Sequence, residues 1–189
     1  MAGENAVTRV RLKPEATTTT VFTIGHSTRS LDELVALLAR NGVTQLADVR
    51  TVPKSRRHPQ FVREALAESL PRAGIAYRHF PGLGGLRKPR RDSTNTAWRN
   101  EGFRGYADYM QTPLFAEALD ELLAWAERPT AIMCAEAVWW QCHRQLIADA
   151  LVARGVEVRH IVSAATPEAH RLTDFARVDG TRVAYPGLV

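Results

Sequence analysis

The chain has 189 residues, of which 45% are hydrophobic and 24% charged, and its formal net charge is +5. This composition is typical of a globular domain and excludes a collagen-like repeat, a disulfide-rich scaffold and a chain that is disordered throughout. No apolar stretch reaches the roughly 20 residues of a transmembrane helix, and residues 1–20 lack the apolar region of a secretory signal. We therefore expect no membrane partner. Because the chain has only two cysteines, Cys134 and Cys142, and no export signal, we also expect a cytoplasmic protein with reduced thiols.

Positive charge is concentrated in one part of the chain. Residues 50–104 contain 13 Lys or Arg and four Asp or Glu, whereas the rest of the chain contains 12 basic and 16 acidic residues. This asymmetry favours an anionic partner, either a small molecule that carries phosphate or a nucleic acid. The alternative is a basic face that only solvent contacts.

The predicted elements alternate between strands and helices. Ser30 and Glu33 predict a capping box at the start of one helix, and Thr112 with Pro113 predicts the start of another. In chain order we expect a disordered tail (1–20), a strand (21–24), a helix (30–41), a strand (45–49), a loop (51–59), a helix (60–73), a strand (75–80), a flexible basic loop (86–102), a short helix (103–110), a helix from 112, a strand (130–134), a helix (141–154), a strand (156–162) and a hairpin (178–183).

The spacing of these elements predicts the fold class. Each strand–helix unit spans about 25–30 residues, which is the length of a crossover between parallel strands. We therefore expect a single three-layer α/β domain over residues 21–189, with a mostly parallel sheet of about five strands flanked by helices.

Polar and reactive residues follow the predicted strands, at the edge of the sheet where α/β proteins bind their ligands. They are His26 and Ser27 after the first strand, Asp48, Arg50, Ser55 and Arg56 after the second, and Cys134, Glu136, Cys142, His143 and Arg144 after the fourth. This convergence is the strongest indication of a site in the sequence.

Seven of these residues are candidates for binding an anion. His26 and Ser27 lie between a strand and a helix start, where backbone N–H groups hold anions. Asp48 and Arg50 lie on one side of their strand, so that Asp48 could orient the guanidinium toward a phosphate. A tight turn and an internal ion pair are the structural alternatives. The remaining candidates are Ser55, Arg56 and Arg144.

The other four residues are candidates for catalysis. Glu136 follows a buried strand, where partial desolvation would suit it to acid–base chemistry or to a role as nucleophile. Cys134 or Cys142, near a helix start and Arg144, could be held as a thiolate, with His143 assisting. The structural alternative is a buried cysteine beside bridging polar groups. No metal site is predicted, because adjacent Cys and His without a second ligand pair are a weak zinc signal.

The same residues carry a resemblance to a known family. The strings Thr23–Ser27, Asp48–Arg50 with Pro53, Ser55 and Arg56, Tyr77 with Leu83–Gly85, and Cys134–Glu136 with Cys142–Arg144 resemble the DUF488 family, in register over about three quarters of the chain. The resemblance implies an α/β domain of this layout, of a kind widespread in bacteria. It implies no reaction, because the family is named for its unknown function.

The favoured hypothesis is an enzyme, a hydrolase or transferase, that acts on a nucleotide, nucleoside derivative or other phosphate-bearing small molecule at the strand ends. One alternative is a nucleic-acid-binding module that uses the basic residues of 50–104. The other is a non-catalytic protein that acts through a partner. The sequence assigns no cofactor and no oligomeric state.

Overall fold

The computed structural model describes residues 20–187. The predicted tail lies outside this range except for Thr20, which begins the first strand one residue earlier than expected. The strands are β1 (Thr20–Gly25), β2 (Gln45–Asp48), β3 (Ala76–His79), β4 (Thr130–Cys134), β5 (Glu157–Ile161), β6 (Glu168–Ala169), β7 (Arg177–Asp179) and β8 (Arg182–Ala184). The helices are α1 (Leu31–Arg40), α2 (Arg63–Arg72), α3 (Glu101–Met110), α4 (Pro113–Trp125) and α5 (Arg144–Val152), with 3₁₀ turns η1 (Pro59–Phe61), η2 (Pro81–Leu83) and η3 (Trp139–Gln141).

The α/β fold predicted from the sequence is confirmed. Six strands form one sheet in the order β3-β2-β4-β1-β5-β6, in which the first five are parallel and the short β6 runs antiparallel to β5. The sheet thus has one strand more than expected. β7 and β8 pair separately as the predicted hairpin.

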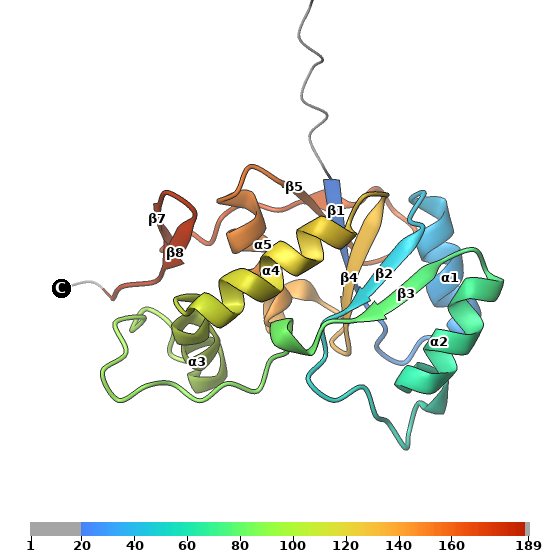
Figure 1. The fold of residues 1–189 in the computed structure, drawn as a ribbon, viewed down its shortest axis with the longest axis horizontal. Coiled ribbons are helices and arrows are strands. Elements are labelled where there is room, and N and C mark those ends of the chain that lie inside the picture. Colours follow the sequence, from blue (N-terminus) through green and yellow to red (C-terminus); the bar gives the residue numbers. More distant parts are fainter. Residues whose placement is uncertain (1–19, 188–189) are drawn as a thin grey trace, which may run out of the picture.

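Helices cover both faces of the sheet and make three layers (Figure 1). Because side chains alternate along a strand, β1, β2, β4 and β5 each contribute buried residues to two apolar clusters. On one face, residues of the strands pack with α1 and α2, and the buried members include Ile24, Leu34, Leu46, Leu66 and Met133. On the other face they pack with α3, α4 and α5, and the buried members include Val21, Ala107, Leu119, Ile132 and Leu146.

The predicted helix starts at Ser30 and Thr112 are confirmed. The Ser30 hydroxyl accepts a hydrogen bond from the Glu33 amide at 3.1 Å, and the Glu33 carboxylate accepts one from the Ser30 amide at 2.6 Å. Thr112 accepts from the Phe115 amide at 3.4 Å. These contacts satisfy N–H groups that the first turn of a helix leaves without partners.

Two predicted helices are each divided into a 3₁₀ turn and a shorter α-helix. The helix expected over 60–73 is η1 followed by α2, and the helix expected over 141–154 is the end of η3 followed by α5. In the second case Cys142 adopts an extended conformation with φ −144° and ψ 154°. Its side chain therefore lies just before the first turn of α5 rather than on the helix surface.

The strand register brings distant residues to one edge of the sheet. Gly25 of β1 lies beside Cys134 of β4, and Asp48 of β2 lies beside Met133 of the same strand. The carboxyl ends of β1, β2 and β4 are consequently neighbours. Within residues 20–187, no helix has both the length and the apolar character needed to cross a membrane.

Candidate active site at the carboxyl ends of β2 and β4

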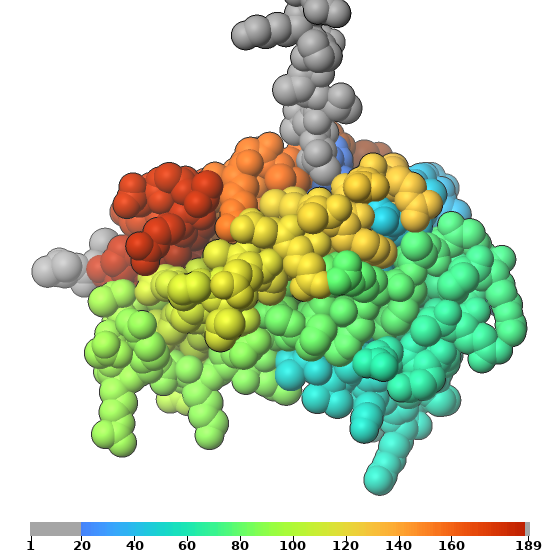
Figure 2. Space-filling model, in the orientation of Figure 1, coloured from blue at the N-terminus to red at the C-terminus, as the bar shows by residue number. Residues whose placement is uncertain are grey.

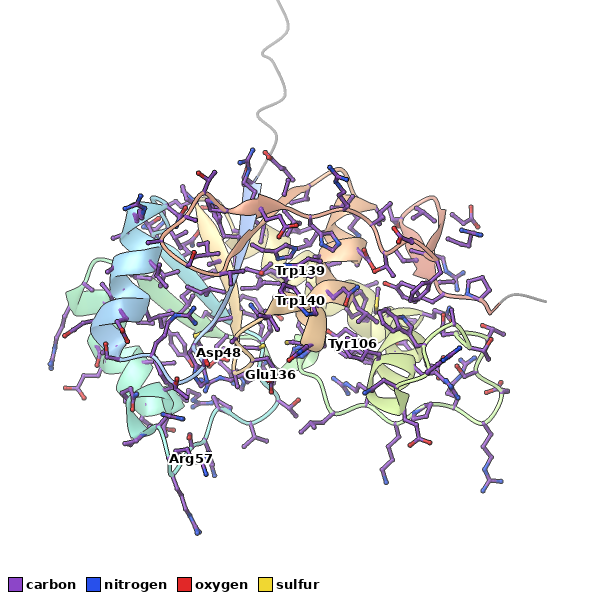
Figure 3. All side chains as sticks on the ribbon, turned by 180° about the vertical axis from the view of Figure 1, so that it is seen from behind. Asp48, Arg57, Tyr106, Glu136, Trp139 and Trp140 are labelled. Carbon is purple, nitrogen blue, oxygen red and sulfur yellow. The ribbon has the colours of Figure 1, made fainter. Side chains whose placement is uncertain are left out.

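A cavity of about 410 Å³ opens at the carboxyl ends of β2 and β4. Its wall comes from the loops after both strands and from the starts of α3 and α5 (Arg50, Thr51, Val52, Gly85, Leu86, Asn100, Gly102, Phe103, Tyr106, Cys134, Ala135, Glu136, Gln141, Cys142 and His143). Figure 3 shows Asp48, Glu136 and Tyr106 gathered at this end of the molecule. The sequence-based placement of a site at the strand ends agrees with this cavity.

The two cysteines meet at the floor of the cavity. Cys134 ends β4 and Cys142 precedes α5, and both are buried free thiols that line the cavity. The Cys142 sulfur lies 3.5 Å from Nδ1 of His143 and accepts from the Arg144 backbone amide at 3.5 Å. The Cys134 sulfur accepts from Nε of Arg144 at 3.0 Å. One guanidinium, one imidazole and two thiols thus form a single cluster.

This environment separates the two thiols chemically. Burial opposes ionisation of Cys142, but hydrogen bonds from the Cys134 thiol and His143, and the charges of His143 and Arg144, outweigh it and hold the Cys142 pKa well below its ordinary value. Burial and the neighbouring Cys142 raise the pKa of Cys134 well above its ordinary value. Cys142 is therefore the thiol of the pair that ionises more readily.

The position of His143 is consistent with this assignment. Its Nε2 lies 2.9 Å from the Val49 carbonyl oxygen, which can only accept, so Nε2 carries a proton. Its Nδ1 faces the Cys142 sulfur, and a thiolate there also requires a donor. His143 thus places Nδ1 beside the Cys142 sulfur while Nε2 is held on the Val49 carbonyl, an arrangement of the kind found beside cysteine nucleophiles.

Arg144 supplies the buried positive charge of the site. Its side chain is 1% exposed, and besides Cys134 it donates from Nη2 to the Glu136 carbonyl at 2.6 Å. Within residues 20–187 no carboxylate forms an ion pair with it, so negative charge on the cysteine pair, held mainly by Cys142, balances it. Burial acts to lower its pKa, but the two cysteines outweigh burial and raise the pKa above its ordinary value.

Glu136 follows β4 at the cavity, as the sequence predicts, but its surroundings differ from the prediction. The expectation of a partly desolvated carboxyl is wrong, because the Glu136 residue is exposed at the rim of the cavity. Only its backbone carbonyl is tied into the site, through Arg144. Its carboxylate can meet a ligand as it enters, but it lacks the low-dielectric surroundings that acid–base tuning by burial requires.

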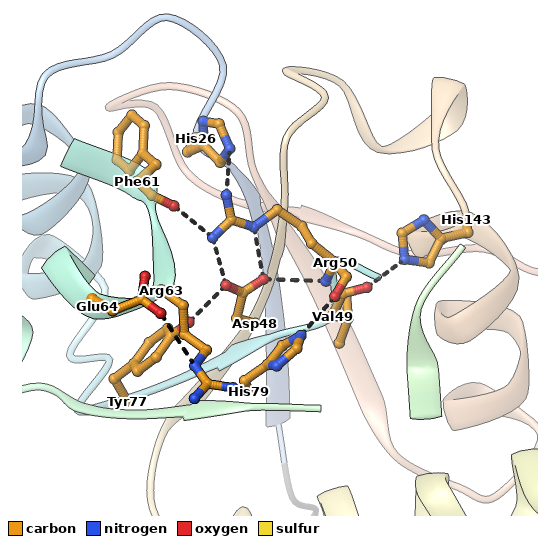
Figure 4. A network of polar contacts seen from close by, with 10 residues as sticks. All are labelled: His26, Asp48, Val49, Arg50, Phe61, Arg63, Glu64, Tyr77, His79 and His143. Carbon is orange, nitrogen blue, oxygen red and sulfur yellow. Dashed lines mark hydrogen bonds and ion pairs between the residues drawn. The ribbon is translucent and has the colours of Figure 1, made fainter. Parts of the chain in front are cut away.

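Asp48, Arg50 and His26 form a second network beside the cavity (Figure 4). Arg50 donates to Asp48 from Nε at 2.8 Å and from Nη2 at 2.5 Å, and Nη2 also donates to the Phe61 carbonyl at 2.8 Å. Nη1 of Arg50 lies 3.2 Å from Nε2 of His26, and Tyr77 donates its hydroxyl to Asp48 at 2.8 Å. The guanidinium fork is thus occupied by partners within the protein.

These contacts favour the structural interpretation of Asp48 and Arg50. Asp48 has no exposed surface and Arg50 is 7% exposed, so the pair is a buried ion pair at the end of β2. His26 stacks on Phe61 with ring centroids 4.2 Å apart. Burial lowers the pKa of His26 to about 4, and the positive charge of Arg50 acts in the same direction. His26 is therefore neutral near pH 7 and accepts from Arg50.

The backbone donors of His26 and Ser27 are also occupied. The His26 amide donates to the Cys134 carbonyl at 3.0 Å, and the Ser27 amide donates to the Ala135 carbonyl at 2.9 Å. The chain then turns at Ser27, whose φ is 49°. These bonds extend the β1–β4 pairing and fix the loop that follows Cys134. They leave neither amide for the anion that the sequence predicts at this turn.

Ser55 and Arg56 lie apart from the cavity wall. The Ser55 hydroxyl accepts from the His58 amide at 2.9 Å, and Arg56 is exposed. Figure 3 shows the neighbouring Arg57 projecting away from the sheet. In Figures 1 and 2 the loop after β2 and the loop before α3 project from the same side of the molecule. Their exposed cations are Lys54, Arg56, Arg57, Lys88, Arg90, Arg91 and Arg99.

The loop at 86–102 contributes to the cavity, which the sequence did not reveal. Asn100 begins α3 and accepts from the Phe103 amide at 3.2 Å, and Phe103 borders the cavity. Farther back, Asp108 accepts from the Arg90 amide at 2.8 Å and from the Asn95 side chain at 2.8 Å. The middle of the loop is thereby attached to α3. A polar stretch without periodicity carried no signal for this arrangement.

Leu86 stands at the mouth of the cavity in a strained conformation. Its φ is 59°, a left-handed value that costs a residue with a Cβ about 1–2 kcal/mol, and it is 87% exposed. Val52, also on the cavity wall, is 57% exposed. Together they give the mouth an apolar rim. Strained residues of this kind occur often at ligand sites.

A buried relay of polar groups lies behind the thiol cluster and was also missed. His170 Nε2 lies 2.8 Å from Asp149 Oδ1, His160 Nε2 lies 2.9 Å from His170 Nδ1, and the Thr23 hydroxyl lies 2.7 Å from His160 Nδ1. Trp139 stacks on His160 with centroids 4.0 Å apart. Through Trp139 the relay supports η3 and so the segment between the two cysteines. Burial, with the charges of His170 and Arg144, lowers the pKa of His160 to about 3.

Among residues 20–187, no three or more His, Cys, Asp or Glu side chains form a group that could hold a metal ion. The candidate site residues predicted from the sequence lie in four places. Cys134, Cys142, His143 and Arg144 form the cluster in the cavity; Glu136 lies at its rim; His26, Asp48 and Arg50 form the adjoining network; and Ser27, Ser55 and Arg56 lie in the flanking turns and loop.

The comparisons with known proteins agree with the motifs. No curated protein and no solved structure matches the chain significantly. Residues 30–151, about two thirds of the chain, match the family described as domain of unknown function DUF488. They include Asp48, Arg50 and the whole of the thiol cluster, whereas His26 precedes the matched range. The chain is therefore a member of the DUF488 family.

Proposed function

We propose that this protein is an enzyme in which the Cys142 thiolate attacks a small substrate that carries an anionic group, such as the phosphate of a nucleotide or nucleoside derivative. One observation carries the proposal. The Cys142 sulfur borders a cavity of about 410 Å³ while His143 Nδ1 and the Arg144 amide each approach it to 3.5 Å. This is the arrangement of an activated cysteine nucleophile.

The start of a helix contributes to this activation. Cys142 lies two residues before Arg144, the first residue of α5, so its sulfur receives a backbone N–H that has no partner inside the helix. The positive end of the helix dipole stabilises a negative charge there. In the attack, the sulfur would form a bond to an electrophilic carbon or phosphorus atom, and protonated His143 would give its proton to the leaving group.

Several features of the cavity support an anionic substrate. The start of α3, with Asn100 and Gly102, lines the same cavity as the start of α5, so the positive ends of two helix dipoles meet there. The two loops that flank the opening are rich in exposed Lys and Arg, and these would attract an anion from solution. The apolar rim at Leu86 and Val52 suits a base or another apolar part of the substrate.

Alkylation of Cys142 tests the proposal. We would measure the rate of its reaction with iodoacetamide from pH 5 to 9 by peptide mass spectrometry, with and without AMP or inorganic phosphate. We expect reaction at pH values where an ordinary thiol is inert, saturable protection by AMP, and no labelling at this position in Cys142→Ser. A Cys142 that reacts only as an ordinary thiol would contradict the proposal.

Charge reversal distinguishes a small substrate from a nucleic acid. Arg57→Glu should weaken the protection by AMP, whereas Arg40→Glu should not, because exposed Arg40 ends α1 at the opposite edge of the sheet. Protection by AMP should depend weakly on salt, since it involves few phosphate contacts. If a short oligonucleotide protects better than AMP, with a steep salt dependence, the nucleic-acid hypothesis replaces this one.

A further inference from the structure

The proposed nucleophilic attack leaves Cys134 chemically unchanged, yet this second thiol lines the same cavity as the nucleophile. It ends β4, 2% exposed, while Cys142 is 5% exposed, and both line the same cavity. Arg144 contacts both sulfurs, through Nε to Cys134 at 3.0 Å and through its amide to Cys142 at 3.5 Å. A small reagent that enters the cavity therefore meets two thiols together.

We propose that Cys134 and Cys142 are a redox-active pair that reduces hydroperoxides and closes into a disulfide. This inference concerns a second reaction of the cavity and requires no phosphate-bearing substrate. It shares with the proposed function the reactive sulfur of Cys142 and the His143 and Arg144 groups around it.

The chemistry balances with a hydroperoxide as the oxidant. The Cys142 thiolate attacks the terminal oxygen of the peroxide, the O–O bond breaks, and Cys142 becomes a sulfenic acid while the alkoxide or hydroxide leaves and takes a proton. The Cys134 sulfur then attacks the Cys142 sulfur, an S–S bond forms, and water leaves. Two thiols lose two electrons and the peroxide gains two. An external dithiol restores the pair by exchange.

The surrounding charges suit the first step. The leaving oxygen develops negative charge, and His143 holds a donor next to the reacting sulfur. Arg144 adds a buried cation that is balanced by the Cys142 thiolate rather than by a carboxylate. Charge can therefore pass from sulfur to the departing oxygen within the field of the same two cations.

The connection between the cysteines allows the second step. Residues 135–141 contain no α-helix or strand, only bends and the short turn η3. A movement of Cys142 toward Cys134 can therefore be absorbed by this segment, while β4 and most of α5 keep their places. Disulfide formation also removes the thiolate that balances Arg144, which disfavours the oxidised form and makes it readily reducible.

Treatment with hydrogen peroxide tests the inference. In the full chain we expect the intact mass to fall by two hydrogens, a Cys134–Cys142 crosslinked peptide, and reversal of both by dithiothreitol. Cys134→Ser should stop at a sulfenic acid on Cys142 that dimedone traps. Cys142→Ser should leave Cys134 unreacted under the same conditions. Cys134→Ala serves as a second variant if the serine variant does not fold.

Other results would overturn the inference. One is a crosslink between two chains in place of the internal one. Another is oxidation of Cys134 that is as fast in Cys142→Ser as in the wild type. A third is that the wild type and Cys134→Ser give identical products. The failures of the two proposals are distinguishable. Fast alkylation of Cys142 with protection by AMP, but without the crosslink, would leave the proposed function and refute this one. A Cys134–Cys142 crosslink without any protection of Cys142 by AMP would support this inference and refute the proposed function.

Discussion

Replacing Asp48 with Ala tests whether the network at the end of β2 is structural. Asp48 accepts four hydrogen bonds, from the Arg50 amide at 3.1 Å, from Nε and Nη2 of Arg50 at 2.8 and 2.5 Å, and from the Tyr77 hydroxyl at 2.8 Å. The substitution leaves the Arg50 guanidinium with neutral partners only. Its side chain is 8% exposed, so water cannot replace the lost carboxylate.

The size of the effect follows from this burial. Removing one partner of a buried ion pair typically costs about 3–5 kcal/mol, because the other charge stays buried without compensation. A domain of ordinary stability has about 5–15 kcal/mol in total. We therefore expect Asp48→Ala to lower the free energy of unfolding by about 3–5 kcal/mol. Asp48→Asn, which keeps an acceptor, should lose less and is the variant to use if the alanine variant does not fold.

Urea denaturation followed by tryptophan fluorescence measures the change. The matched control is Glu68→Ala, which breaks an exposed Glu68–Arg72 pair one helical turn apart and should cost only about 0.3–0.5 kcal/mol. In the double variant Asp48→Ala/Arg50→Met no buried charge is left unpaired, so it should be more stable than Asp48→Ala. A loss below about 1 kcal/mol for Asp48→Ala, or strict additivity in the cycle, would refute the structural interpretation.

Three further predictions concern the rest of the site. Gly25→Ala should unfold the loop after β4 and abolish fast alkylation of Cys142, because a Cβ at this position would lie 1.7 Å from the Glu136 carbonyl oxygen. The control is Gly74→Ala, where a Cβ meets open space at φ 74°; it should lower the free energy of unfolding by about 1–2 kcal/mol and leave alkylation unchanged. The pKa of His26 is about 4 in the folded protein and 6.5 is its ordinary value, so the unfolded chain binds more protons between these pH values. The contribution of His26 to stability should therefore be full above about pH 6.5 and fall toward pH 4. In urea titrations at several pH values, His26→Gln should reduce this pH dependence. Tyr106→Phe should lose about 1–3 kcal/mol in the same assay, because a buried backbone carbonyl that accepts from the hydroxyl at 2.7 Å would lose its partner.

Much of the fold could be predicted because its signals are local. The capping box at Ser30 and the run of strands and helices depend on neighbouring residues, and they led to the correct class and to nearly all elements. The errors lie where tertiary contacts decide. The extended backbone at Cys142 divides a helix that the apolar spacing made continuous. The two-residue β6 forms because it pairs with β5, and its own sequence carries no strand signal.

The sequence could predict which residues of the site lie close together, but not which of their hydrogen-bonding groups are free. Strand ends in a parallel sheet converge, so Cys134, Cys142 and Arg144 were placed together correctly. Which donors are already occupied depends on residues far away in the chain. His26 is tied to Arg50, 24 residues later, and Gly25 brings the Cys134 loop close enough to occupy the amides that an anion would need. Such competition leaves no trace in a local motif.

The two buried arginines show why this distinction matters for function. Arg50 and Arg144 follow β2 and β4, neighbouring strands of the sheet, and in the sequence each looks equally suited to hold an anion. Arg50 has a carboxylate partner with ideal two-point geometry, so an incoming anion would have to displace Asp48 at the cost of leaving that carboxylate buried and unpaired.

Arg144 is different because its charge is balanced by sulfur alone. Within residues 20–187 its side chain contacts Cys134 and the Glu136 carbonyl, and its amide contacts Cys142, with no acidic side chain paired to it. A carboxylate there would neutralise the guanidinium and remove the reason for Cys142 to ionise. The buried cation without a carboxylate is thus what makes the end of β4 chemically active, whereas the paired Arg50 makes the end of β2 rigid.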